Sequence, residues 1–147
     1  MEAERADAIV AEAHTWLNTP YVPRALIKGV GVDCGGLLYK VYEKFIDGQM
    51  EKYPDDYSAD WALHEGPERY LDFIKPYVHQ VPRAVKGGFS VFHFGNHYAH
   101  GAIYCGDDWY IHAWGRQRQG RVAKQRTRVL MGISDTRVFA PLHYEPN

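Results

Sequence analysis

Apolar side chains recur every three or four residues in the first part of the chain, which is the spacing of an amphipathic helix. One stripe is formed by Ala6, Ile9, Val10, Ala13, Trp16 and Leu17, and a second by Leu37, Leu38, Val41, Tyr42 and Phe45. Asn18, Thr19 and Pro20 end the first predicted helix, and Ile46, Asp47 and Gly48 end the second. Residues 21–32, between these helices, are rich in turn formers and are predicted to be a loop. Two further helical segments are predicted to begin at Ser58 and at Pro67.

From Val78 onward the helical spacing gives way to short apolar runs separated by turn residues, a pattern typical of strands. The predicted strands are 78–81, 90–94, 100–105, 109–114, 121–124 and 137–142. Glycine-containing breaks at 87–88, 95–96, 106–108 and 115–120 separate them. Helices followed by consecutive strands predict an α+β fold with an antiparallel sheet.

Composition and charge narrow the class of protein. The chain has 147 residues, of which 46% are hydrophobic and 24% are charged, as is ordinary for a soluble globular domain. We therefore expect one domain spanning residues 1–147. The net charge of −1 gives no field that would attract nucleic acid, and no apolar run approaches the ~18 residues that cross a bilayer. Neither nucleic acid nor a membrane is an expected partner.

The N-terminal residues 1–5 (Met-Glu-Ala-Glu-Arg) are charged and lack the apolar centre of a signal peptide. Synthesis in the cytoplasm without a signal peptide is therefore expected.

Cys34 is the first candidate for chemistry, because it follows a glycine-rich turn and begins the second predicted helix. Asp33 is a suitable N-cap, so Cys34 would lie in the first helical turn, near unpaired backbone N–H groups and the positive end of the helix dipole. This position favours the thiolate, which is the reactive form of cysteine. A small buried thiol at a helix start is the alternative interpretation. The other cysteine, Cys105, is far away in sequence and is expected to be an inert core residue.

A cysteine nucleophile needs a base within hydrogen-bonding distance, and the base needs a third group to orient it. His100 and His112 lie on two consecutive predicted strands. A connecting loop with an odd number of residues, such as 106–108, would pair Ala102 with His112. The two histidines would then be diagonal neighbours on one face, about 7–8 Å apart. A two-residue turn would pair Ile103 with His112 and place the rings on opposite faces. Whether the rings meet depends on the parity of this loop, and two strand histidines satisfied by local hydrogen bonds are the alternative.

The reactivity of Cys34 is expected to depend on His100. A helix terminus contributes up to ~2 kcal/mol, or about 1.5 pKa units, which takes the pKa of a thiol from ~8.5 to about 7. The neighbouring Asp33 carboxylate opposes this effect. Pairing with an imidazolium lowers thiol pKa values to about 3–4 in papain-type sites. Cys34 without His100 is therefore expected to be a sluggish nucleophile.

A zinc site is a competing interpretation of the same region. His93, His97 and His100 are close in sequence, and Cys34 could supply a fourth ligand. However, residues 93–97 pass through a Gly-Asn turn, which does not preset a ligand geometry, so no metal is expected.

Three stretches carry a family resemblance. The first, Trp16-Leu17-Asn18-Thr19-Pro20-Tyr21, is similar to W-x-G-T-P-Y, and the second, Asp33-Cys34-Gly35-Gly36-Leu37, is similar to D-C-x-G. The third comprises His-Gly-Ala-Ile-Tyr at 100–104 and Ile-His-Ala at 111–113, similar to H-[VA]-[GA]-I-Y and [FI]-[VI]-H-A. In this order the motifs resemble those of the NlpC-type cysteine peptidases of the papain-like superfamily, which cut peptidoglycan stem peptides. The resemblance covers most of the chain.

Some positions depart from the family pattern. Asn18 replaces the usual glycine, Gly35 fills a position often held by serine, and Gly-Phe-Ser at 88–90 stands in place of G-D-[LV]. The region 57–61 and the long loop at 21–32 resemble the branch of the family encoded in phage tail and prophage modules.

The resemblance implies a papain-like α+β fold in which the Cys34 helix packs on an antiparallel sheet bearing His100 and His112. It implies that Cys34 is the nucleophile, that His100 is the base and that His112 orients His100. Tyr21 would help the backbone N–H of Cys34 to stabilise the oxyanion. Asp33, Gly35 and Trp114 are the implied substrate-binding residues, and no metal or cofactor is implied.

The implied activity is that of a cysteine peptidase that hydrolyses peptidoglycan stem peptides, at the γ-D-glutamyl–diamino-acid bond. The phage branch adds phage tail proteins as partners, with action in the virion tail or at the bacterial cell wall or periplasm. The basic run of Arg116, Arg118, Arg121, Lys124, Arg126 and Arg128 either attracts stem-peptide carboxylates or is a solvated loop and strand. A structural tail-tip component with weak or no hydrolase activity is one alternative function. Hydrolysis or transfer on another amide or acyl substrate is a second alternative.

Overall fold

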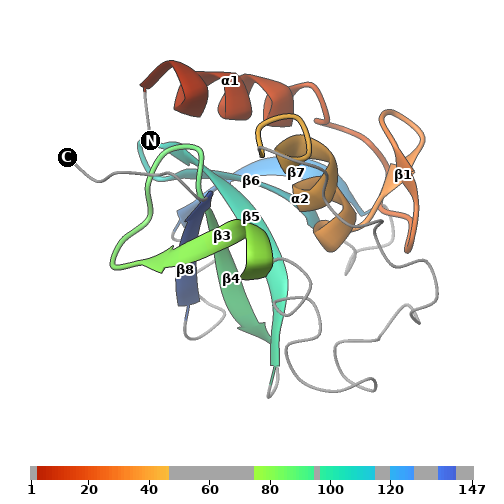
Figure 1. Ribbon diagram of the computed structural model, residues 1–147. Coiled ribbons are helices and arrows are strands. Elements are labelled where there is room, and N and C mark those ends of the chain that lie inside the picture. Colours follow the sequence, from red (N-terminus) through yellow and green to blue (C-terminus); the bar gives the residue numbers. More distant parts are fainter. Residues whose placement is uncertain (1–2, 47–74, 95–96, 115–119, 128–135, 142–147) are drawn as a thin grey trace.

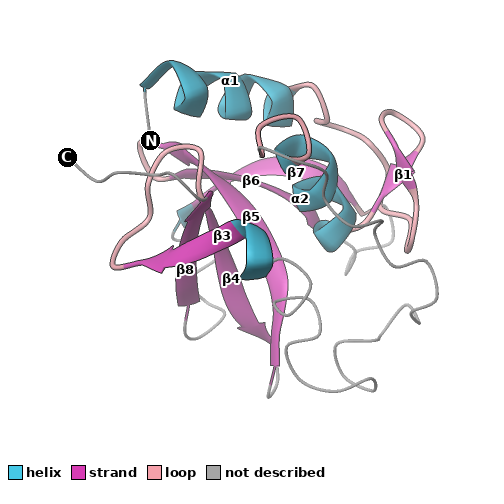
Figure 2. Ribbon diagram, viewed as in Figure 1, coloured by secondary structure: helices cyan, strands magenta, loops and turns pink. Residues whose placement is uncertain are grey.

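The computed structural model describes residues 3–46, 75–94, 97–114, 120–127 and 136–141. The helical segments predicted to begin at Ser58 and Pro67, and the stretch 57–61, lie outside these residues. The described elements are two α-helices, a short 3-10 helix and strands that form two sheets (Figures 1 and 2).

The larger sheet has six strands, all antiparallel to their neighbours, in the order β3-β8-β4-β5-β6-β7. Its strands are β3 (Val78–Val81), β4 (Phe89–Phe94), β5 (His97–Gly106), β6 (Trp109–Trp114), β7 (Arg121–Arg126) and β8 (Thr136–Pro141). The six predicted strands coincide with these within three residues at each end. β8 inserts between β3 and β4, so the last strand joins the first two. The predicted α+β class with an antiparallel sheet is therefore confirmed.

The two helices are α1 (Ala3–His14) and α2 (Cys34–Tyr42), and a 3-10 turn (Lys75–Tyr77) leads into β3. α1 ends earlier than the apolar stripe predicted, because the backbone N–H groups of Trp16 and Leu17 bond three residues back instead of four. Asn18 then adopts a φ of 70°, which stops the helix. Trp16 is nonetheless buried, so the stripe continues to pack after the helix has ended.

The prediction that residues 21–32 form a loop was wrong in part. Within that stretch β1 (Leu26–Ile27) pairs with β2 (Gly31–Val32) in a small antiparallel hairpin. Strands of two residues are too short to leave a periodic pattern in the sequence.

The main hydrophobic core joins both helices to one face of the six-stranded sheet (Figure 1). The helices contribute Ile9, Ala13, Leu37, Leu38, Val41 and Tyr42, and the sheet contributes Phe89, Val91, Ile103, Ile111, Ala113, Val122 and Phe139. A smaller cluster of Phe92, Ala102, Tyr110 and Tyr104 forms separately. Along β5 and β6, the residues of this smaller cluster alternate with the residues of the main core. None of the helices in the described ranges combines the length and hydrophobicity needed to cross a bilayer.

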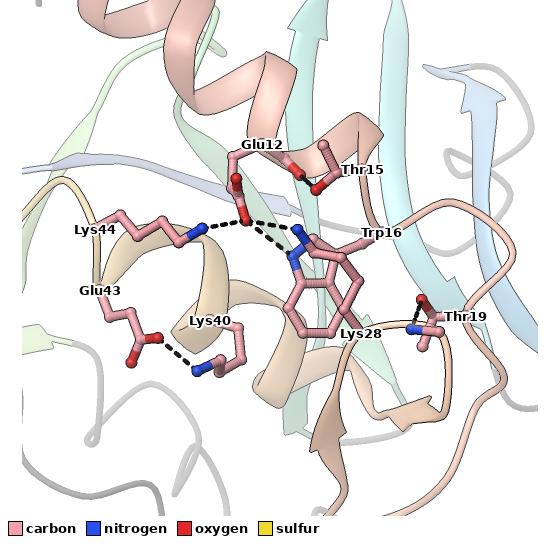
Figure 3. Close-up of polar contacts among 9 residues, drawn as sticks. Glu12, Thr15, Trp16, Thr19, Lys28, Lys40, Glu43 and Lys44 are labelled. Atoms are coloured by element: carbon pink, nitrogen blue, oxygen red, sulfur yellow. Dashed lines mark hydrogen bonds and ion pairs between the residues drawn. The ribbon is translucent and has the colours of Figure 1, made fainter.

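Glu12 on α1 ties three segments together (Figure 3). Its Oε1 atom accepts hydrogen bonds from the ammonium groups of Lys28 at 3.1 Å and Lys44 at 2.9 Å, and from the Trp16 indole at 3.4 Å. Lys28 belongs to the turn of the β1–β2 hairpin, and Lys44 follows α2. The contacts therefore hold the hairpin and the C-terminal end of α2 against α1.

Candidate active site

Cys34 is the first residue of α2, as the sequence predicted. Asp33 is the N-cap, with an extended backbone, and its Oδ1 atom accepts a hydrogen bond from the Gly36 backbone N–H at 2.7 Å. Its Oδ2 atom accepts a second hydrogen bond, from the Arg24 backbone N–H at 2.9 Å. Asp33 is 3% exposed, so this one carboxylate fixes both the helix start and the loop before β1. These contacts give Asp33 a structural role, and its predicted contact with substrate stays a prediction.

Gly36 allows the helix start to lie close to the hairpin. A Cβ atom at this position would lie 2.9 Å from Leu26 Cδ2 and 3.2 Å from the carbonyl oxygen of Ala25. Both distances are shorter than ordinary van der Waals contact, so a larger residue would push the hairpin away from α2. The second glycine of the Asp-Cys-Gly-Gly stretch is therefore required by packing.

The thiol of Cys34 is protonated in the resting site. Burial is the largest cause, and together with the Asp33 carboxylate it raises the pKa of Cys34 to about 12. Hydrogen bonds from the backbone N–H groups of Gly101, Gly35 and Cys34 itself act in the opposite direction and are weaker. The expectation that the helix start favours the thiolate was therefore wrong in its net result. Desolvation of the buried sulfur outweighs the field of the helix terminus.

The hydrogen bond from Gly101 also fixes where Cys34 lies. Gly101 follows His100 on β5, so the sulfur at the head of α2 lies against the strand that carries the candidate base. Gly35, another predicted site residue, is buried beside Cys34 and supplies one of the backbone N–H groups that favour the thiolate.

Tyr21 is held beside Cys34 by its backbone. The segment before it lies between β7 and β2, because Tyr21 N–H donates to the Gly120 carbonyl at 2.8 Å and Val32 N–H donates to the Pro20 carbonyl at 3.0 Å. Burial is the largest cause that raises the pKa of Tyr21 far above its usual range, and the nearby Cys34 and Asp33 groups add to it. The phenol therefore remains protonated and can donate a hydrogen bond.

His100 and His112 meet on one face of the sheet. Their rings lie edge to face with centroids 5.0 Å apart, and His100 Nε2 is 2.8 Å from His112 Nδ1. Both side chains are buried, with exposed fractions of 7% and 0%. The structure therefore brings together the two histidines that the sequence singled out.

The register that brings the rings together arises differently from the prediction. The turn has two residues, Asp107 and Asp108, both with positive φ, and Gly106 pairs with Trp109. Such a turn alone would place the rings on opposite faces. A bulge between Tyr104 and Gly106 restores the pairing of Ile103 with Ile111 that an odd loop gives. The predicted register is confirmed, and the predicted three-residue loop is replaced by a two-residue turn with a bulge.

Trp114 borders the histidine pair. Its ring lies 5.1 Å from that of His100, nearly perpendicular to it, and 5.5 Å from that of His112. Phe92 approaches His100 from β4 at 6.3 Å. These aromatic side chains surround the imidazoles and limit their rotation, while the predicted contact of Trp114 with substrate stays a prediction.

Gln125 on β7 is a site residue that the sequence did not reveal. Its Oε1 atom lies 2.7 Å from His112 Nε2. The predicted strand 121–124 ends one residue before Gln125, and within this stretch only the basic side chains indicate a function. Its neighbours on either side in sequence, Lys124 and Arg126, instead lie over the ring of Trp109. Continuing the period-2 alternation of the strand by one residue would have placed Gln125 on the face of Ala123, which pairs with His112.

The zinc interpretation depends on two histidine side chains that the structure does not describe. His93 and His97 have side chains outside the described part of the chain. Within that part, the structure contains no group of three histidine, cysteine, aspartate or glutamate side chains that could hold a metal ion. His100 is instead engaged with His112.

Comparison with known proteins places this geometry in a family context. The model of the NlpC/P60 family matches residues 18–131, a range that includes Tyr21, Cys34, His100, His112 and Gln125. Among the curated proteins, no sequence matches this chain.

Solved structures share the fold. The NlpC/p60 domain of the peptidoglycan hydrolase SagA is 24% identical, with a TM-score of 0.59 over 90% of this chain and 97% of that one. NlpC1 from Trichomonas vaginalis is 17% identical with a TM-score of 0.62, over 87% of this chain and 41% of that one. An N-acetylmuramoyl-L-alanine amidase from Bacteroides uniformis is 15% identical with a TM-score of 0.57, over 95% and 99% of the two chains. At these identities the likeness establishes the fold, and the predicted papain-like α+β architecture is confirmed.

Proposed function

Because this chain belongs to the NlpC/P60 family, we propose that it is a peptidoglycan hydrolase of the cysteine peptidase type, with Cys34 as its nucleophile. One observation carries the proposal: the Cys34 sulfur accepts a hydrogen bond from Gly101, next to His100, and His100 is 2.8 Å from His112. A nucleophile, a base and an orienting group are the parts that acyl transfer requires. The substrate class is supported by SagA, a peptidoglycan hydrolase with the same fold.

In the proposed reaction, His100 accepts the thiol proton as the Cys34 sulfur attacks the carbonyl carbon of the scissile amide. This order follows from the pKa of about 12, because the resting thiol has to be deprotonated when the substrate arrives. His100 then gives the proton to the departing amine, and a thioester to Cys34 remains. Water attacks the thioester while His100 accepts a proton from it, which releases the carboxylic acid and restores the thiol.

The negative charge that develops on the carbonyl oxygen has two donors near Cys34. The backbone N–H of Cys34 lies at the N-terminal end of α2, and the protonated Tyr21 hydroxyl is near enough to Cys34 for the two groups to interact electrostatically. Donors of this kind contribute roughly 3–4 kcal/mol to transition-state stabilisation when they are preorganised. Tyr21 is therefore assigned the second oxyanion contact in this proposal.

The proposed bond is that between γ-D-glutamate and the diamino acid of the stem peptide, as the motif resemblance implies. One similar structure is an N-acetylmuramoyl-L-alanine amidase, so the amide between muramic acid and L-alanine is the competing bond. Digestion of defined muropeptides, followed by mass measurement of the fragments, distinguishes the two. Release of a fragment that begins with the diamino acid supports the proposed bond, and release of the complete peptide contradicts it.

Replacement of Cys34 by alanine tests the hydrolase proposal directly. The thiol is in a buried cluster, so Cys34→Ala leaves a small cavity and is expected to keep the fold. The variant is expected to release no new amino groups from purified peptidoglycan, while Cys105→Ala keeps the wild-type rate. A wild-type rate of release by folded Cys34→Ala would refute the assignment of the nucleophile.

A structural tail-tip component with little hydrolase activity is the second candidate function, and thiol alkylation separates it from the first. In a catalytic pair, His100→Ala slows the alkylation of Cys34 at neutral pH, because the base that removes the thiol proton is gone. Replacement of His14, a histidine on α1, is the matched control. Cys105 serves as an internal standard, since burial raises the pKa of its thiol to about 11. Equal Cys34 rates with and without His100 would favour the structural role.

Association with a phage tail is part of the proposal and rests on the sequence resemblance of residues 21–32 and 57–61. It places the site of action in the virion tail or at the bacterial cell wall. Mass spectrometry of purified phage particles from a lysogenic host tests it. Presence of the chain at a fixed ratio to tail proteins supports the association, and its absence from intact particles contradicts it.

A further inference from the structure

Three polar side chains cross the sheet diagonally on adjacent strands. His100 lies on β5, His112 on β6 and Gln125 on β7, and the strands are neighbours in the sheet. On β7, the direct partner of His112 is Ala123, so Gln125 is two residues further along on the same face. The three side chains form a chain of hydrogen bonds. The distances in it are 2.8 Å from His100 Nε2 to His112 Nδ1 and 2.7 Å from His112 Nε2 to Gln125 Oε1.

The carbonyl oxygen of Gln125 determines where the protons lie. An amide oxygen only accepts hydrogen bonds, so His112 Nε2 carries a hydrogen and donates it. His112 is fully buried, and burial lowers its pKa more than the hydrogen bond to Gln125 raises it, so its ring is neutral at neutral pH. A neutral ring with a hydrogen on Nε2 has its lone pair on Nδ1. His100 Nε2 must therefore be the donor in the bond between the two rings.

The tautomer of His100 determines which of its ring nitrogens can accept the proton of Cys34. When His100 carries its hydrogen on Nε2, the lone pair of the neutral ring is on Nδ1. In the mechanism proposed above, His100 has to accept the proton of Cys34 with the nitrogen that is not bonded to His112. If the direction of these hydrogen bonds were reversed, His112 would donate from Nδ1. The hydrogen of the neutral His100 ring would then lie on Nδ1, and this nitrogen could not act as a base.

We propose that Gln125 is a positioning residue, which holds His112 and, through it, His100 in the tautomers that keep the lone pair of His100 on Nδ1, where it can accept the proton of Cys34. The proposal rests on the hydrolase function proposed for Cys34 and His100. It assigns to β7 a part of the site that neither the motifs nor the predicted strand included. In the serine proteases, an enzyme whose triad histidine is in the wrong tautomer loses on the order of 10⁴-fold in kcat. This sets the upper limit of the loss expected when Gln125 is replaced.

Three replacements of Gln125 separate the possible roles of the side chain. Gln125→Glu keeps an acceptor, Gln125→Leu removes the hydrogen bond, and Gln125→Lys offers only donors to His112 Nε2. The glutamate variant is expected to keep turnover within a fewfold at mildly alkaline pH, where His112 is neutral. The leucine variant is expected to lose about tenfold, because a buried N–H without a partner disfavours the correct tautomer. The lysine variant is expected to lose on the order of 10³-fold or more, because it enforces the reverse tautomer.

The direct measurement is nitrogen-15 NMR of the imidazole rings, which reads the tautomer of each histidine without any substrate. Wild-type protein and Gln125→Glu are expected to show hydrogen on Nε2 of both His100 and His112. Gln125→Leu is expected to shift His112 toward the Nδ1 form. Lys124→Gln, on the same strand with an exposed side chain, is the matched control for the spectra and is expected to leave the tautomers of both histidines unchanged.

The outcomes separate this inference from the function on which it rests. Wild-type His112 with its hydrogen on Nδ1, or unchanged tautomers and turnover in Gln125→Leu, would overturn the positioning role. Loss of turnover in Gln125→Leu with unchanged tautomers would also overturn it, since the effect would then be structural. A wild-type protein that is no more active than Cys34→Ala would overturn the hydrolase proposal instead, whatever tautomers the spectra show.

Discussion

Replacing Asp33 by asparagine is expected to destabilise the protein and, at the same time, to make Cys34 more acidic. The carboxylate accepts one hydrogen bond from Gly36 N–H at 2.7 Å and one from Arg24 N–H at 2.9 Å. Asparagine caps a helix about as well as aspartate, so its carbonyl oxygen can keep the first bond. The amide NH₂ then faces the Arg24 N–H, donor against donor, and the second bond is lost.

The size of the effect follows from these contacts. Asp33 is 3% exposed, so a polar group that loses its partner here costs ~1–3 kcal/mol. Loss of the charge at the helix N-terminus adds ~0.3–1 kcal/mol. For a chain of 147 residues, with about 2–4 °C per kcal/mol, we expect a melting temperature lower by roughly 5–10 °C.

The pKa of the Cys34 thiol is expected to fall in the same variant. The Asp33 charge is the second cause, after burial, that holds the pKa of Cys34 near 12, so its removal lowers that pKa. Cys34 of Asp33→Asn should therefore be alkylated at a lower pH than Cys34 of the wild type, provided that the variant is folded at the temperature of the assay. Asp33→Ala, which also loses the cap, is the comparison and is expected to cost a further ~1 kcal/mol.

Urea denaturation gives the free energies of unfolding, and peptide mass spectrometry after brief alkylation gives the rate at Cys34 as a function of pH. Cys105 in the same digest corrects for differences in reagent. An Asp33→Asn protein as stable as the wild type would show that the bond to Arg24 contributes nothing. A thiol pKa that stays the same or rises in this variant would contradict the electrostatic account of the site.

Two further predictions concern the scaffold. Burial acts to raise the pKa of Glu12, but hydrogen bonds from Lys44 and Lys28 outweigh burial and lower that pKa. The stabilisation by these ion pairs is therefore present above the unfolded pKa of ~4.3 and is lost as the pH falls through the pKa of Glu12 in the folded protein. Glu12→Gln should therefore lower the free energy of unfolding by ~0.5–1 kcal/mol at neutral pH and by progressively less as the pH falls below the unfolded pKa, and a difference that does not shrink in acid would contradict an ionic origin. Asn18 is exposed with a φ of 70°, where glycine is tolerated and β-branched residues are not. Asn18→Gly should change the melting temperature little, whereas Asn18→Val should cost ~1–2 kcal/mol, and equal melting temperatures for the two variants would refute the backbone explanation.

The sequence by itself determined the local parts of the site. Asp33 caps the helix that Cys34 begins because the carboxylate and the Gly36 N–H are only three residues apart, a distance that the chain covers within one turn. The strands of the sheet follow from short apolar runs separated by turn residues, and they lie within three residues of their predicted bounds. His100 and His112 could be identified as partners because side chains alternate along strands, so only the parity of one loop was open.

The tertiary structure decided what depends on distant segments. The bulge beside Cys105 sets the register of the two histidines, and Gln125 reaches His112 only because β7 pairs with β6 in a register set beyond the intervening loop. The pKa of Cys34 rises because other elements bury its sulfur, although the helix start alone favours the thiolate. Periodicity encodes contacts between residues a few positions apart, whereas register across loops and desolvation are properties of the assembled core.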